Sequence, residues 1–238
     1  MTWSIIAYDK ISGLTGIAVS TCAFAVGARV PTIVTGVGGV ASQSFVNPYY
    51  GPQAIALMRA GASAQEALDK ITQDDAGREM RQAHIMDAQH RFATFTGAGC
   101  VDWCGSLIRD SFSVAGNMLA GPQVIEKTAE HYAAKADLPF AQRLIEALKA
   151  GEAVGGDKRG KQSAALLIHD GEDYALLDLR VDDHTDPLAE LTRLEAVSRG
   201  RFAHYRKFMP SNAHPAGITD RAELERLIAA SMAEEAKR

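Results

Sequence analysis

The chain has few cysteines, few aromatic residues and no excess of positive charge. Its 3 cysteines are an odd number, which argues against a disulfide framework and favours a reducing compartment. We therefore expect a cytoplasmic protein. Aromatic residues make up 7% of the chain and the net charge is −4. Neither the stacking surface nor the basic surface of a nucleic-acid-binding protein is present, so we expect no nucleic-acid partner.

Long apolar runs are missing as well. Gly, Pro or a charged residue interrupts each apolar stretch well before the length of a membrane span, and no cationic segment precedes an apolar run at the start. We therefore expect no secretory signal and no membrane partner. The chain has 238 residues, of which 47% are hydrophobic, and this is enough for one large domain with a proper core.

Short strand-like segments occur in pairs, and turn residues join the two members of each pair. Tight turns mean that the paired strands run antiparallel. Val30–Ser42 is a further strand-like segment, which Gly36, Gly38 and Gly39 loosen. The paired segments are 2–8 with 14–21, 84–87 with 92–96, 106–109 with 112–118, and 163–168 with 174–181.

Two helices follow each of the first two strand blocks. The first pair begins near Pro52, and its second helix opens with Ser63 and Glu66, the spacing of a capping box. The second pair covers 122–150, with Gly151 as a natural C-terminal stop.

Two more helices are expected near the end of the chain. Asp186 caps the first of them, ahead of Pro187, and its Leu188, Leu191, Leu194 and Val197 face inward. The second is an amphipathic helix at 220–235, with Thr219 as its cap.

This order of elements predicts an α+β fold. Two antiparallel blocks, each followed by a helix pair, fit two stacked sheets covered by helices on both outer faces, a four-layer α/β/β/α sandwich. We assign residues 1–204 to this domain and 205–238 to a polar segment with a C-terminal amphipathic helix. That helix can pack against a neighbour, and we expect a homodimer or a larger homo-oligomer.

Thr2 stands directly behind the initiator Met1. If Met1 is removed, Thr2 carries a hydroxyl and a free α-amine, and the amine can take the proton as the hydroxyl attacks a carbonyl. The alternative is structural, since a β-branched residue is common at the start of an edge strand.

The loop from Gly155 to Ser163 is a second candidate. Gly156 lets the backbone turn tightly, and Asp157, Lys158 and Arg159 concentrate charge before a buried strand. Lys158 or Arg159 can hold a substrate carboxylate, and Lys158 can lower the pKa of Thr2. The alternative is a solvated loop with an internal ion pair.

Three further polar residues are candidates for the same site. Asn117 can supply its amide to an oxyanion, and the alternative is a strand-end Asn that satisfies local backbone. Asn47 is a similar, weaker candidate for substrate binding. Tyr49 and Tyr50 can line the mouth of a pocket or pack at an interface.

Metal and cofactor chemistry have little support. Cys100 and Cys104 lack the further ligands of a zinc site, so a buried pair of thiols is the preferred interpretation. Asp182, Asp183 and His184 stand at a strand exit, where such residues usually face solvent. We expect neither a metal nor a cofactor.

Seven stretches together span roughly the first four-fifths of the chain. They are TWSIIAYD at the start, FAVGARVP (24–31), NPYYGP (47–52), TGAGCVDWCG (96–105), GNMLAGPQV (116–124), GGDKRGKQSAALL (155–167) and LRVDDHTDP (179–187). These stretches resemble an uncharacterised bacterial family, domain of unknown function 1028, which is assigned to the N-terminal-nucleophile (Ntn) hydrolase superfamily.

The resemblance implies the four-layer sandwich and, by analogy, hydrolysis of an amide bond by an N-terminal nucleophile, where Thr2 lies here. We expect no propeptide before Thr2, so activation would rest on removal of Met1 alone. The function expected is an amidohydrolase that acts on a small amide or peptide-like substrate. The alternative is a non-catalytic ligand-binding or assembly protein of this fold that retains Met1.

Overall fold

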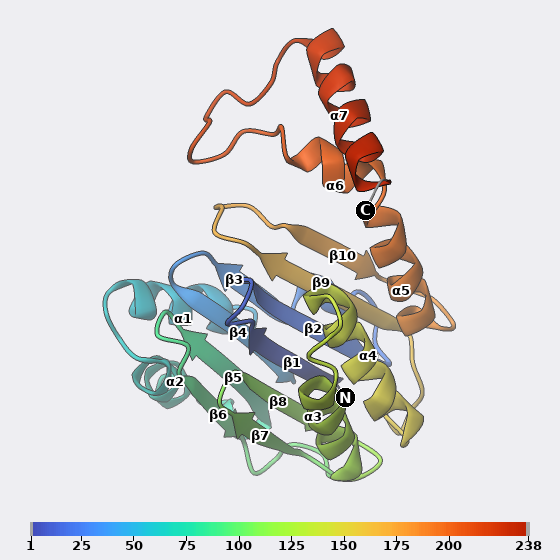
Figure 1. Cartoon of the computed structure of the whole chain (residues 1–238). Helices are drawn as coiled ribbons and strands as arrows, with labels where there is room; N and C mark the ends of the chain where they lie inside the picture. The colour runs from blue at the N-terminus through green and yellow to red at the C-terminus, as the bar shows by residue number, and fades with distance from the viewer. Residues whose placement is uncertain (1, 237–238) are drawn as a thin grey trace. The chain divides into compact units, whose positions relative to one another are not determined.

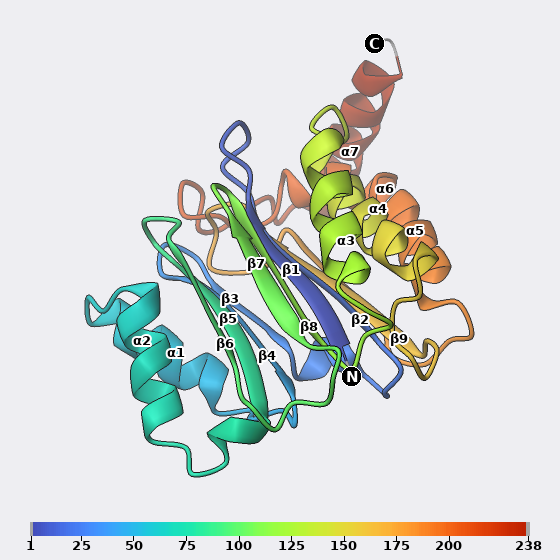
Figure 2. The ribbon, with the colours of Figure 1, turned by 90° about the horizontal axis from the view of Figure 1, so that it is seen from below.

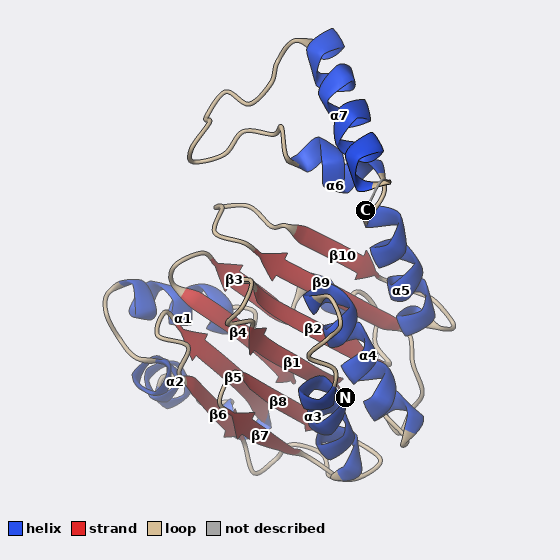
Figure 3. Ribbon diagram, in the orientation of Figure 1, coloured by secondary structure: helices blue, strands red, loops and turns tan. Residues whose placement is uncertain are grey.

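The computed structural model describes residues 2–236, so the condition that Met1 is removed lies outside the described residues. Two compact units are present, one up to Leu191 and one from Thr192 onward. The described residues form seven α-helices and two antiparallel sheets (Figure 3), which confirms the prediction of an α+β protein. The division after residue 204 stays a prediction.

The larger sheet has six antiparallel strands in the order β10-β9-β2-β1-β8-β7 (Figure 1). β1 lies in its interior, paired with β2 on one side and with β8 on the other, where Thr2 stands opposite Asn117. Thr2 is therefore not on an edge strand. The strands are β1 (Thr2–Tyr8), β2 (Thr15–Thr21), β7 (Gly105–Arg109), β8 (Phe112–Asn117), β9 (Ser163–His169) and β10 (Leu177–Val181).

The smaller sheet has four antiparallel strands in the order β3-β4-β5-β6. The prediction of one strand over Val30–Ser42 is wrong, because the chain turns between β3 and β4. Gly36 and Gly38 adopt φ angles of 71° and 151°, which a residue with a side chain rarely adopts, and so permit this turn. The strands are β3 (Pro31–Val34), β4 (Gly38–Ser44), β5 (Arg81–Asp87) and β6 (Phe92–Thr96).

The two sheets pack face to face, and a helix pair covers the outer face of each (Figure 2). The capping box at the start of α2 is confirmed: the Ser63 hydroxyl accepts from the Glu66 N–H, and the Glu66 carboxylate accepts from the Ser63 N–H at 2.8 Å. The smaller sheet is covered by α1 (Tyr50–Arg59) and α2 (Ala64–Gln73), and the larger by α3 (Gln123–Ala134) and α4 (Phe140–Ala153).

Small residues let the layers approach closely. A Cβ on Gly16 of β2 would lie 2.7 Å from a methyl carbon of Leu144, so this glycine lets α4 lie directly on the strand. Between the sheets, Ile6 and Ile17 of the larger sheet pack with Ala41 and Met86 of the smaller one. The layers are thus joined by apolar contact, which is the main stabilising contribution in such a fold.

The sequence suggested that α4 ends at Gly151, and this prediction is wrong. The helix continues to Ala153, and a Cβ at Gly151 would lie 2.3 Å from Oγ1 of Thr128 in α3. The glycine therefore permits close helix packing rather than a C-terminal cap.

The C-terminal region agrees with the prediction at the start of α5 and differs from it at Val197 and at the cap of α7. Asp186 caps α5 (Pro187–Ser198), as predicted, by accepting from the Ala189 N–H at 3.1 Å, and Leu188 and Leu191 are buried. Val197, however, is exposed. The cap of α7 (Arg221–Glu235) is Asp220 rather than Thr219, since its carboxylate accepts from the Glu223 N–H.

A short helix that the sequence did not predict, α6 (Arg201–Arg206), belongs to the second unit. It contacts α7 through His204, whose Nδ1 lies 2.8 Å from the Ser231 hydroxyl, and through an ion pair between Arg201 and Glu225. Across residues 2–236, no helix has both the length and the apolar character needed to cross a membrane.

Candidate functional site

A cavity of about 400 Å³ lies at the end of the sheets where β1 begins. This volume falls within the range of small-molecule sites. Its wall brings together residues from segments that are far apart in the sequence. The lining residues are Thr2, Thr21, Ala23, Phe24, Val26, Arg29, Val30, Ser44, Phe45, Val46, Val101, Asn117, Met118 and Arg159. We call it the Thr2 cavity.

Thr2 is the first residue of β1 and is buried between β2 and β8. Its hydroxyl donates a hydrogen bond to the hydroxyl of Thr21, the last residue of β2, at 3.1 Å. No sequence pattern singled out Thr21. The two hydroxyls sit together on the wall of the cavity, and the strand pairing fixes the backbone that carries them.

Asn117 stands beside Thr2 at the end of β8 and is also buried. Its amide nitrogen donates to the Thr2 carbonyl at 3.4 Å and to Oε1 of Gln82 at 3.0 Å. Both amide hydrogens are thus directed at oxygens of the chain itself. In this arrangement Asn117 holds the Thr2 backbone in place, and it would have to exchange one bond to reach a substrate oxygen.

A buried polar network continues from Asn117 between the two sheets. Gln43 donates to Gln82 at 2.8 Å, and its Oε1 accepts from the Ser4 hydroxyl at 2.7 Å. Beyond Ser4 lies His84, whose Nε2 is 2.8 Å from the Ser4 oxygen. We call Ser4, Gln43, Gln82, His84 and Ser113 the inter-sheet network. None of these five residues was predicted to belong to a site.

His84 is neutral in this network. Because the Ser4 hydroxyl donates to Gln43, it accepts from Nε2–H of His84, and Nδ1 accepts from the Ser113 hydroxyl at 2.7 Å. Complete burial lowers the pKa of His84 to about 3, because it disfavours the charged imidazolium.

Asp157 ties the loop before β9 to the end of β2. Its buried carboxylate accepts from the backbone N–H groups of Cys22 and Arg159, each at 2.8 Å, and lies 3.3 Å from the Arg159 guanidinium. Gly156, at a φ of 45°, lies against the ring of Trp3. These contacts hold Arg159 at the cavity wall, whereas Asp157 and Gly156 lie behind it.

Lys158 is directed elsewhere. Its ammonium group donates to the carbonyl of Asp102 at 3.0 Å, and Lys158 is not among the residues that line the Thr2 cavity. The structure thus brings Thr2, Asn117 and Arg159 together at the cavity. The roles predicted for these residues and for Lys158 stay predictions.

Arg29 and Ser44 also line the cavity, although neither was predicted to be a functional residue. Arg29 lies in the family-like stretch FAVGARVP, which was a signal for it. Ser44 and Met118 have left-handed backbones, with φ of 71° and 57°, and Ala25, beside the lining residue Val26, has φ of 55°. Strained backbones in residues other than glycine cluster at functional sites, so their gathering here supports a role for the cavity.

Asn47 and Tyr49 are not among the lining residues of the Thr2 cavity. The Asn47 amide donates to Asp75 at 3.1 Å, and the same carboxylate receives hydrogen bonds from Tyr50 and Arg81. Burial acts to raise the pKa of Asp75, but the hydrogen bonds from the Gly77 N–H, Arg81, Asn47 and Tyr50 outweigh it and lower the pKa to about 2. This cluster anchors α1, and Tyr49 beside it is exposed.

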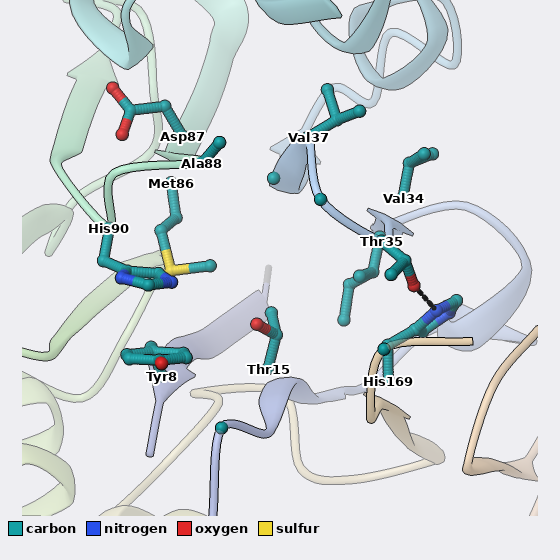
Figure 4. A pocket seen from close by; sticks show the side chains of 15 residues that line it. Tyr8, Thr15, Val34, Thr35, Val37, Met86, Asp87, Ala88, His90 and His169 are labelled. Atoms are coloured by element: carbon teal, nitrogen blue, oxygen red, sulfur yellow. Dashed lines mark hydrogen bonds between the residues drawn. The ribbon is translucent and has the colours of Figure 1, made fainter. Parts of the chain in front are cut away.

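A second cavity, of about 200 Å³, lies at the other end of β1 (Figure 4). Tyr8, the last residue of β1, stacks on His90 with ring centroids 3.4 Å apart. Across the cavity Nδ1 of His169 lies 3.0 Å from the Thr35 hydroxyl. The sequence showed no pattern in these histidines, because His90 lies in the turn after β5 and His169 ends β9, and only the fold places both at this cavity.

The residues considered for metal binding take other partners. Among residues 2–236, no three His, Cys, Asp or Glu side chains form a group that could hold a metal ion. Asp182 pairs with Arg180, and Asp183 accepts from Gln162. Cys100 is buried and Cys104 half-buried; all cysteines in the described part of the chain are reduced.

Comparisons with known proteins identify relatives of this chain. A family model described as "Family of unknown function (DUF1028)" matches residues 2–191. The crystal structure of protein SPO2555 from Silicibacter pomeroyi, assigned to the same family model, has 32% sequence identity and a TM-score of 0.85, with 92% of this chain and 99% of that chain covered.

A more distant match is Anbu (ancestral beta-subunit) from Yersinia bercovieri, at 9% identity and a TM-score of 0.39, with 84% of this chain and 94% of that chain covered. A likeness at this level supports no conclusion about this chain. A search of curated proteins gave no match.

Proposed function

The chain belongs to the DUF1028 family, and we propose that it is an amidohydrolase of the N-terminal-nucleophile type, acting on a small amide or peptide-like substrate through Thr2. One observation carries the proposal: the Thr2 hydroxyl stands at the start of an interior strand, on the wall of a cavity of small-molecule size. The stacked sheets between helix pairs are consistent with the four-layer sandwich of that superfamily.

The reaction requires a free α-amine on Thr2, which removal of Met1 would provide. The Thr2 hydroxyl attacks the amide carbonyl and its proton passes to the α-amine, which then protonates the leaving nitrogen as the C–N bond breaks. The product is an acyl ester on Thr2. Water, deprotonated by the same amine, attacks the ester, releases the acid and restores the hydroxyl.

Neighbouring residues have supporting roles in this proposal. Asn117 positions Thr2 through the bond to its carbonyl, and Thr21 orients the hydroxyl. Asp157 and Gly156 hold the loop that places Arg159 at the cavity, where its guanidinium can contact a substrate. Lys158, which bonds to the Asp102 carbonyl, stabilises the same loop.

We expect the Thr2→Ala variant to lose activity on amide substrates by about 10³-fold or more, because the nucleophile is gone while the cavity remains. The measurement is amide hydrolysis by tag-free protein whose intact mass lacks Met1, together with the mass of the acyl adduct on Thr2. Thr15→Ala, at the other end of the larger sheet, is the matched control and should keep full activity.

Two results would contradict the proposal. Activity in Thr2→Ala equal to that of the wild type would remove Thr2 from the mechanism. An intact mass that retains Met1 would leave the reaction without its base and favour a non-catalytic ligand-binding protein.

A further inference from the structure

The charge of the Thr2 cavity contrasts with that of the whole chain. The chain carries a net charge of −4, yet the ionisable side chains among the lining residues are two arginines, Arg29 and Arg159. No Asp or Glu lines the cavity in the described part of the chain. A concave wall of one sign attracts a ligand of the opposite sign, so this cavity selects for an anion.

The two arginines differ in their partners. The Arg159 guanidinium lies 3.3 Å from the buried Asp157 carboxylate, which offsets its charge. Arg29 is exposed and forms no ion pair with a carboxylate within residues 2–236. Arg29 therefore supplies the uncompensated positive charge. Its planar guanidinium can donate two parallel hydrogen bonds to a carboxylate.

Apolar side chains form much of the remaining wall. Phe24 and Phe45 are 58% and 61% exposed, although both line the cavity. Val26, Val46 and Met118 extend the apolar surface inward. Large apolar side chains that gather around a cavity and stay exposed mark a surface that a ligand covers.

We propose that the substrate is a small amide bearing one carboxylate and one apolar group, an N-acyl amino acid being the simplest such molecule. The carboxylate pairs with Arg29, the apolar acyl group covers Phe24 and Phe45, and the amide carbonyl faces Thr2. Hydrolysis adds one water and releases the acyl acid and the amino acid. This inference rests on the proposed function for the position of the amide, but the binding of the carboxylate can be tested without turnover.

The experiment measures binding to the full chain carrying Thr2→Ala, so that no probe is consumed. The probes are N-phenylacetylglycine and N-hexanoylglycine, each compared by calorimetry with its uncharged glycinamide counterpart and with N-acetylglycine. Each acylglycine should bind more tightly than its neutral counterpart by on the order of tenfold, which is typical of a charge-assisted hydrogen bond. N-acetylglycine, which lacks the apolar group, should bind more weakly than either.

Adding Arg29→Gln should reduce affinity for the two acylglycines by a similar factor and leave the neutral probes unchanged. Arg59→Gln is the matched control: Arg59 is exposed in the last turn of α1, and its removal changes the net charge equally without touching the cavity. Arg29 is exposed, so its replacement should leave the fold intact, which a thermal melt checks.

Equal binding of acid and neutral amide, no binding of any probe, or no effect of Arg29→Gln would each overturn this inference. Failure of the proposed function has a different signature. If the acylglycines bind through Arg29 but the wild-type protein without Met1 never hydrolyses them, the ligand class stands and the amidohydrolase proposal falls.

Discussion

Gly151 illustrates how a single residue sets the distance between two elements. It lies in the last turn of α4, buried against α3, where a Cβ would meet Thr128 Oγ1 at 2.3 Å, the Val124 carbonyl oxygen at 3.0 Å and Trp3 Nε1 at 3.1 Å. Two of these atoms belong to α3 and the third to β1. No side chain fits here without separating the helices.

We expect Gly151→Ala to destabilise the protein by about 1–3 kcal/mol, in spite of the better helix propensity of Ala, because overpacking a tight core forces backbone shifts. Urea unfolding gives the free energy of unfolding. Gly39→Ala is the control, since its Cβ would meet side chains at ordinary distances of 3.5 Å and beyond. Equal stability of both variants would show that α3 and α4 are not tightly packed at Gly151.

At the scale of elements, the surface between the sheets is polar at the Thr2 end. Gln82 is completely buried there; its oxygen accepts from Gln43 and Asn117, and its nitrogen donates to the Gly116 carbonyl at 2.8 Å. Gln82 therefore joins β4, β5 and β8 and supports the residue that holds the Thr2 backbone.

Gln82→Leu should reduce the free energy of unfolding by about 2–4 kcal/mol, because several buried polar groups lose a partner at once. If the proposed function is correct, it should also lower kcat, since Asn117 loses its support. Gln65→Leu on the exposed face of α2 is the matched control and should change stability by no more than about 0.5 kcal/mol. Similar effects of the two substitutions would argue against a structural role for the inter-sheet network.

The sequence predicts the elements better than it predicts the site, and β5 shows why. The hairpin between β1 and β2 and the Ser63–Glu66 capping box are local signals, and the structure confirms both. Gln82 and His84 alternate with Ala83 and Ile85, a pattern typical of a strand with one solvated face, yet the polar face lies between the sheets. Only the long-range packing of the second sheet reveals this.

The site itself is assembled from distant segments. Thr2 could be singled out because its chemistry depends on its place in the chain. Ser44 carries no such local signal, and Arg29 was marked only by its family-like stretch; the fold brings both to the same cavity. Asn47 and Tyr49 stand in a family-like stretch, but the Asp75 cluster accounts for Asn47 in structural terms.

At the scale of the whole molecule, His84 links folding to pH. Its pKa is about 3 in the folded protein, against an ordinary value of 6.5. Between these values the unfolded chain binds a proton that the folded protein does not bind. The contribution of His84 to the free energy of unfolding is therefore fully present above about pH 6.5, and it is lost as the pH decreases toward 3.

We expect the free energy of unfolding to decrease by about 2 kcal/mol between pH 7 and pH 5 through His84 alone. Burial also lowers the pKa of His90, which adds a loss of the same sign. Urea unfolding across this range measures the slope, and His84→Gln should flatten it. A slope unchanged by that substitution would mean that His84 is protonated inside the fold.

The left-handed residues beside the Thr2 cavity bear on how such a sequence is selected. A left-handed backbone costs a residue with a side chain on the order of 1–2 kcal/mol, and glycine avoids this cost. A chain selected for stability alone would carry glycine at positions 44 and 118, but this one has Ser44 and Met118, both on the cavity wall. Ser44 and Met118 therefore trade stability for a side chain on the cavity wall. A search for variants that melt at a higher temperature would begin by replacing these two residues with glycine.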